Sequence, residues 1–77
     1  MWPGLPLSTR FIFYVIQYAI EQEIEHMNED DIEECVLGMP DAFIEEYNTN
    51  YSKEQAMLNS IQALINRMLE AWYHECE

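Results

Sequence analysis

Two pairs of side chains in the sequence have the spacing of metal ligands on a helix. Glu23 and His26 are three positions apart, and Glu70 and His74 are four apart. Di-iron helical bundles use the Glu-x-x-His spacing twice and add two further carboxylates, whereas this chain has that spacing once. His74 and Cys76 are two positions apart and would point to different sides of a helix. No complete ligand set results, so we expect neither a metal site nor a bound cofactor.

Other residue types with catalytic or ligand chemistry also lack their partners. Asn28, Asp30 and Glu33 offer oxygen ligands, but a calcium loop of this kind also needs a central glycine, which is missing here. Cys35 has no basic side chain near it in the sequence, and the carboxylates around it disfavour a reactive thiolate. With two glycines in the whole chain, a glycine-rich phosphate loop is excluded. We expect that the protein is not an enzyme.

The most unusual part of the chain is the segment from Glu21 to Glu46, which holds eleven acidic residues and no Lys or Arg. Bringing like charges together by folding costs stability, which indicates that the charge has a use at a basic partner. Carboxylates three or four apart on a helix have Cβ atoms about 5 to 6 Å apart, comparable with the close spacing of charges along a nucleic-acid backbone. The alternative is a solvated surface that only keeps the protein dissolved.

The predicted partner-binding surface combines acidic side chains of this segment with two tyrosines as anchors. Its residues are Glu29, Asp30, Asp31, Glu33, Glu34, Asp41, Glu45, Glu46, Tyr14 and Tyr18. The tyrosines share a helical face with Glu21 and Glu25, at spacings of four, three and four. Rings that flank the core with their hydroxyls in water are the alternative interpretation.

The overall charge restricts the class of partner. Three basic and fifteen acidic residues give a net charge of −12, which disfavours direct binding to DNA, RNA or anionic lipid. We therefore expect a basic protein, one that itself binds DNA or RNA, as the partner, and a cytoplasmic location. The apolar run 11–20 is half as long as the about 20 residues that a bilayer span needs, and it is predicted to be a buried helix.

The composition predicts one folded domain over residues 1–77, because 49% apolar residues are too many for an intrinsically disordered chain. Residues 1–7 contain Pro3, Gly4 and Pro6 and are predicted to be an irregular lead. Trp2 in this lead is expected to pack back on the domain, with an exposed anchor for a partner as the alternative. Cys35 and Cys76 are expected to be reduced thiols, with a single bridge between them as the alternative.

Two long helices are predicted, at about 9–27 and 53–75. Ser8 and Thr9 are good N-caps for the first helix, and Ser52 with Gln55 matches a capping box for the last. A strand over 11–16 is the rival interpretation, but no second strand is available to pair with it. The two long helices are expected to be antiparallel, with the last as the spine of the domain.

Two short acidic helices are predicted between the long ones, at about 29–37 and 40–47. Asn28 caps the first short helix and Gly38 ends it, while Pro40 suits the first position of the second. The fold class is therefore a small, compact all-α domain. Its predicted core consists of Ile16, Ile20, Ile24, Phe43, Ile44, Ile61, Leu64, Ile65 and Met68.

Taken together, small size, high acidity and lack of catalytic motifs predict an inhibitor that occupies the basic surface of a nucleic-acid-handling protein. Phage-encoded inhibitors of bacterial defence, including anti-CRISPR proteins and restriction inhibitors, commonly look like this. The host cytoplasm of a bacterium would then be the location. The alternative function is a helical structural or regulatory module that self-associates through leftover apolar surface, for instance as a homodimer. Salt distinguishes the two, because charge-driven binding weakens with ionic strength and apolar association does not.

Overall fold

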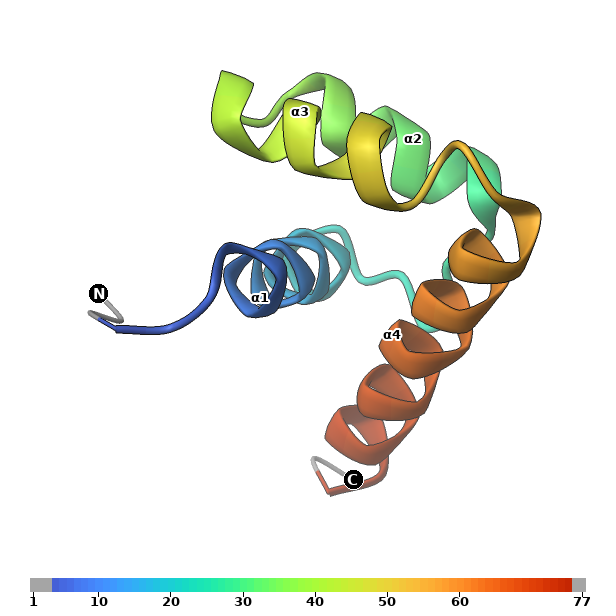
Figure 1. Ribbon diagram of the computed structural model, residues 1–77. Helices are drawn as coiled ribbons and strands as arrows, with labels where there is room; N and C mark the ends of the chain where they lie inside the picture. The colour runs from blue at the N-terminus through green and yellow to red at the C-terminus, as the bar shows by residue number, and fades with distance from the viewer. Residues whose placement is uncertain (1–3, 76–77) are drawn as a thin grey trace.

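Four helices account for most of residues 4–75, the part of the chain that the computed structural model describes (Figure 1). They are α1 (Leu7–Glu21), α2 (Glu29–Leu37), α3 (Asp41–Asn50) and α4 (Gln55–Glu75). The predicted all-α class, with two long helices and two short ones between them, is confirmed. The predictions for Trp2 and Cys76 lie outside the described residues. Within 4–75, none of the helices has the length and apolarity required to cross a membrane.

Helix α1 contacts each of the other three helices, and so does α2. Figure 1 shows α2 and α3 side by side above α1, with α4 on its other side. Three side chains of α1 are completely buried: Phe11, Val15 and Ala19. The last helix, α4, is the longest and buries Leu58, Ile61, Ile65 and Leu69, so the two long helices share the core. The uncharged sequence of residues 11–20 suits the burial of α1, because it has no charged side chain that must stay in water.

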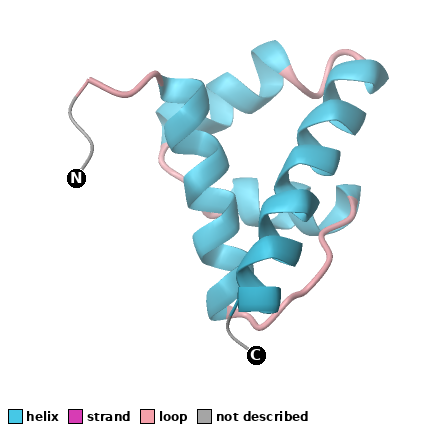
Figure 2. Ribbon diagram, turned by 90° about the horizontal axis from the view of Figure 1, so that it is seen from below, coloured by secondary structure: helices cyan, strands magenta, loops and turns pink. Residues whose placement is uncertain are grey.

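The sequence led us to expect antiparallel long helices, but α1 and α4 are not antiparallel. In Figure 2, α1 and α4 converge with their C-terminal ends together. The side chains agree, because Ile12 near the start of α1 shares a hollow with Leu64, and Ile20 near its end shares one with Trp72. Helices α2 and α3 account for this orientation of α4. They run in opposite directions and together return the chain toward the N-terminal end of α1, where α4 begins (Figure 2).

Helix α1 ends at Glu21 rather than at the predicted Met27. The amide of Ile24 donates to the carbonyl of Ala19 at 2.8 Å, and the amide of Glu23 donates to that of Ile20 at 3.1 Å. Glu23 has a left-handed φ of 58°. These two hydrogen bonds around a left-handed residue form a Schellman motif, which closes a helix.

The acidic residues after Ile20 explain the early end of α1. Carboxylates are unfavourable near the negative C-terminal end of a helix dipole, and Glu21, Glu23 and Glu25 lie there. The loop that follows still contributes apolar side chains, since Met27 is fully buried and Ile24 packs against the core. The side chain of Asn66 in α4 holds this loop through two hydrogen bonds to the backbone of Met27. Its Oδ1 accepts from the Met27 amide at 2.7 Å, and its Nδ2 donates to the Met27 carbonyl at 2.8 Å.

Helix α2 has the predicted bounds, and its start is fixed by a capping box. The amide of Asp31 donates to Asn28 Oδ1 at 2.9 Å, and the amide of Asn28 donates to Asp31 Oδ2 at 3.1 Å. Ile32, Cys35 and Val36 are buried and point inward. Helix α2 thereby directs its acidic face away from the core.

The remaining helix starts differ from the predictions by a few residues. Helix α1 begins at Leu7 after Pro6, without a cap from Ser8 or Thr9. Helix α3 begins after Pro40 and continues to Asn50, past the predicted end at residue 47. Helix α4 begins at Gln55, and Ser52 does not cap it, because its hydroxyl donates to the Asn48 carbonyl at the end of α3.

The core confirms most of the predicted residues and corrects one. Phe43, Ile61 and Ile65 are buried, and Ile16, Ile20, Ile24 and Ile44 pack against the core; Met68 is half-buried. Leu64, by contrast, is 41% exposed. The apolar stripe of α4 is wider than the surface it packs on, and it faces the core through Leu58, Ile61, Ile65 and Leu69.

Candidate protein-binding surface

The outward face of α2 is acidic and carries one large apolar side chain. Asp30, Glu33 and Glu34 are exposed on it. Leu37 lies four residues after Glu33 on the same face and is 75% exposed. Sequence reasoning missed Leu37 as a candidate contact, although an apolar residue one turn after exposed acids was the available signal. Leu37 is therefore available to contact a partner beside these acids.

The two predicted tyrosine anchors lie in a hollow between α1 and α2. Tyr14, Tyr18 and Glu21 from α1 line it together with Glu34 and Gly38, and its volume is about 350 Å³. Tyr14 is 38% exposed. Folding therefore brings both predicted anchors next to one predicted acid, which the sequence separates by more than a dozen residues.

The electrostatics of this hollow favour a cation. Burial raises the pKa of the Tyr18 hydroxyl, and the nearby carboxylates of Glu34 and Asp31 raise it further. Tyr18 thus stays neutral and can donate a hydrogen bond while its surroundings are negative. Aromatic faces beside carboxylates suit a guanidinium or ammonium group, through cation–π attraction and charge-assisted hydrogen bonds.

Three of the predicted contact residues have roles within the fold. Asp31 caps α2. Glu29 accepts a hydrogen bond from the side-chain amide of Gln55. Glu46 is hydrogen-bonded to Tyr51, whose pKa is raised by burial first and then by this carboxylate. Their side chains are therefore partly committed to holding the helices together.

The acids of α3 form a second group. Glu45 and Glu46 line a hollow of about 330 Å³ together with Leu7 and Thr49, and Asp41 is exposed at the start of α3. The ten predicted residues consequently do not share one hollow. They lie instead on three helices, and α2 and α3 sit side by side in the layer above α1 (Figure 1).

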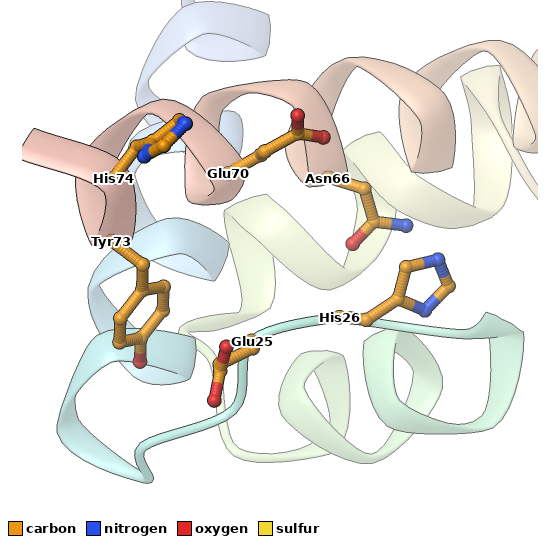
Figure 3. Close-up of a pocket in the computed structure, with 6 residues that line it drawn as sticks. All are labelled: Glu25, His26, Asn66, Glu70, Tyr73 and His74. Carbon is orange, nitrogen blue, oxygen red and sulfur yellow. The ribbon is translucent and has the colours of Figure 1, made fainter.

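Three of the four residues with metal-ligand spacing in the sequence line a pocket between α4 and the loop that follows α1. Glu25, His26, Asn66, Glu70, Tyr73 and His74 line it, with a volume of about 320 Å³ (Figure 3). His26 thus lines the same pocket as Glu70 and His74, at the opposite end from His74 (Figure 3), whereas Glu23 does not line it. Among residues 4–75, no group of three or more His, Cys, Asp or Glu side chains is arranged to hold a metal ion.

The described cysteine is chemically quiet. Cys35 is a buried free thiol, and burial raises its pKa to about 12. A thiol with such a pKa has almost no thiolate at neutral pH, so it packs as a small apolar side chain.

Comparison of the chain with known protein families, with curated proteins and with solved structures finds no match.

Proposed function

We propose that this chain is a small acidic binding protein that inhibits a nucleic-acid-handling protein by occupying its basic surface, in the manner of phage-type anti-defence or anti-CRISPR-like inhibitors. The observation that carries the proposal is the exposed acidic face of α2, continued by the exposed acids of α3. No Lys or Arg lies between residues 21 and 46 to neutralise it.

Competition for phosphate sites is the proposed mechanism. Carboxylates on successive helical turns are spaced closely enough to meet several cationic side chains at once. A groove that binds nucleic acid is lined with such cations. While the acidic helices occupy the groove, the nucleic acid is excluded from it, and no chemical step by the inhibitor is needed.

The hollow between α1 and α2 is the proposed centre of recognition. An arginine or lysine side chain of the partner enters between Tyr14, Tyr18 and Glu34, and Leu37 contacts apolar surface beside it. Arginine suits this arrangement better than lysine, because its planar guanidinium group can stack on a ring and bind a carboxylate at the same time. The acids further along α2 and α3 supply long-range attraction, which accelerates association.

Affinity capture with purified variants tests the proposal. Asp30→Asn, Glu33→Gln and Glu34→Gln are combined in one chain and compared with a control in which Glu54, Glu70 and Glu75 become Gln. All six carboxylates are exposed, so each variant loses three charges. We expect the first variant to lose captured basic proteins and the control to keep them. Equal capture by both variants would show that net charge alone, rather than this surface, is responsible.

Ionic strength provides the second arm of the experiment. We expect capture to weaken steeply between low and high salt, because interactions between exposed charges are screened beyond a Debye length of about 10 Å at 0.1 M. Capture that survives high salt would favour the alternative function, a self-associating helical module without a charge-driven partner. The observation in favour of that alternative is the exposure of Met57, Leu64 and Trp72 on α4.

A further inference from the structure

One side of the molecule exposes large apolar side chains, whereas the surface of a monomeric domain is usually polar. Met57, Leu64 and Trp72 of α4 are 43%, 41% and 47% exposed. Half-buried apolar side chains of both long helices lie beside them. The set, called the α1/α4 face below, consists of Ile12, Phe13, Ile16, Ile20, Met57, Leu64, Met68 and Trp72.

Two apolar hollows lie on this face, and both are formed where α1 and α4 approach each other. Ile12, Met57 and Leu64 help to line the first, with a volume of about 180 Å³. Ile16, Ile20 and Trp72 help to line the second, of about 390 Å³. Both hollows are shallow and open, so the face offers a broad apolar surface for a second surface to cover.

The α1/α4 face carries little charge, and Glu21 lies at the edge of its second hollow. Residues 11–20 contain no charged residue, and residues 55–69 contain only Arg67. In Figure 2, α1 and α4 lie in front, and α2 and α3 lie behind them. The apolar and the acidic surfaces therefore belong to different layers of the fold.

We propose that a second copy of this chain covers the α1/α4 face, giving a two-fold symmetric dimer. Two chains that each carry a charge of −12 repel strongly when their acidic layers meet. Contact through the α1/α4 face keeps those layers apart and still removes large apolar side chains from water. The apolar face thus selects both the contact and its orientation.

The size of the molecule is sufficient for such an interface. A standard interface buries about 800 Å² on each partner, roughly one seventh of the 5357 Å² accessible surface of this chain. The molecule measures 36 × 30 × 19 Å along its principal axes, so one broad side supplies that area. Small domains with little core commonly gain stability by oligomerisation.

Lys53, two residues before α4, favours an antiparallel arrangement of the two α4 helices, while the exposed Glu54 beside it offsets part of this attraction. Lys53 and Glu75 are each eleven positions from Leu64, on opposite sides of it, and both are exposed. A two-fold axis near Leu64 therefore brings Lys53 of one copy toward Glu75 of the other. In a two-fold symmetric interface each contact occurs twice, so this pairing would form at both ends of the two α4 helices.

The dimer would present its two acidic layers outward, in opposite directions. If the proposed function holds, the dimer can engage two basic sites at once, and the second binding event becomes intramolecular. Dimerisation itself rests only on the α1/α4 face and is independent of the proposed function.

Light scattering coupled to size-exclusion chromatography tests the dimer on the full chain at about 100 μM, well above a micromolar dissociation constant. We expect the wild type to have a mass near 18 kDa, twice the 9.2 kDa of one chain. Leu64→Glu should reduce it to one chain. Ala63→Glu adds the same charge to the neighbouring exposed residue, which lines neither hollow, and should leave the dimer intact.

Circular dichroism confirms that each variant is folded, and Met57→Glu replaces Leu64→Glu if the latter is not. Added salt should strengthen the dimer by screening the repulsion between the chains, whereas it should weaken capture of a basic partner. A wild type that is monomeric at this concentration, or a dimer that Leu64→Glu and Met57→Glu leave unchanged, would overturn the proposal. The face would then be open to a different chain.

Discussion

At the scale of single residues, Glu23 is the clearest case of a residue type that does not suit its place. It adopts a left-handed φ of 58° at the end of α1, where glycine is usual. It also adds a negative charge at the negative end of the helix dipole. Sequence reasoning continued the helix to residue 27, because the apolar spacing continues to Met27 and no glycine marks the end. A carboxylate in the position of a glycine cannot be recognised from spacing alone.

Replacing Glu23 with glycine should therefore stabilise the fold. A left-handed conformation costs a residue with a side chain about 1 to 2 kcal/mol, and part of this is returned as entropy of the more flexible unfolded chain. We expect the free energy of unfolding in urea to rise by about 0.5 to 1 kcal/mol. Glu25→Gly removes a charge from the same loop, where the φ is not left-handed, and should not stabilise the protein comparably.

Cys35 provides a prediction on pH. Its pKa is raised from 9.0 to about 12 by burial, so the folded state disfavours the thiolate. The folded pKa exceeds the unfolded value. The contribution of the neutral Cys35 thiol to the free energy of unfolding is therefore complete below pH 9 and is lost as the pH rises toward 12.

Alkylation with iodoacetamide measures this protection directly. In a Cys76→Ser variant, Cys35 is the single cysteine. At pH 9 we expect slow labelling of the folded protein and fast labelling in denaturant. Equally fast labelling in both states would show that Cys35 is accessible in the fold, contrary to its burial.

At the scale of helices, the sequence predicts elements better than it predicts their mutual orientation. The N-cap at Asn28 and the bounds of α2 were predicted, because both depend on residues a few positions apart. The direction of α4 relative to α1 was not, since it depends on how α2 and α3 return the chain. The same limit explains Leu64: a stripe that is apolar over more than one face does not say which edge meets the core.

Neighbouring residues of α4 test its rotation about its own axis. Ile65 is fully buried, so Ile65→Ala should reduce the free energy of unfolding by about 2 to 5 kcal/mol. Leu64→Ala should reduce it by less than about 1 kcal/mol, as usual for partly exposed positions. Dilute protein should be used in the urea titration, so that dissociation of a dimer does not contribute. A larger loss at Leu64 than at Ile65 would mean that α4 faces the core by the other edge.

At the scale of the whole molecule, charge and apolarity are sorted into different layers. The acidic excess could be predicted from the sequence, as could its place on two short helices. Its relation to Tyr14 and Tyr18 could not, because the hollow that joins them to Glu34 forms only when α1 and α2 pack. Leu37 was overlooked for a similar reason: its exposure of 75% depends on what covers the C-terminal end of α2.

Displacement by nucleic acid is the most direct test of the central claim, that the acidic surface takes the place of a phosphate backbone. Immobilised protein is loaded with the host proteins that it captures at low salt, and short double-stranded DNA or RNA is then added at constant ionic strength. We expect the oligonucleotide to release the captured proteins as free wild-type protein does, and the variant with Asp30→Asn, Glu33→Gln and Glu34→Gln to release fewer. Captured proteins that free wild-type protein displaces, but that still bind nucleic acid while attached, would contradict the claim.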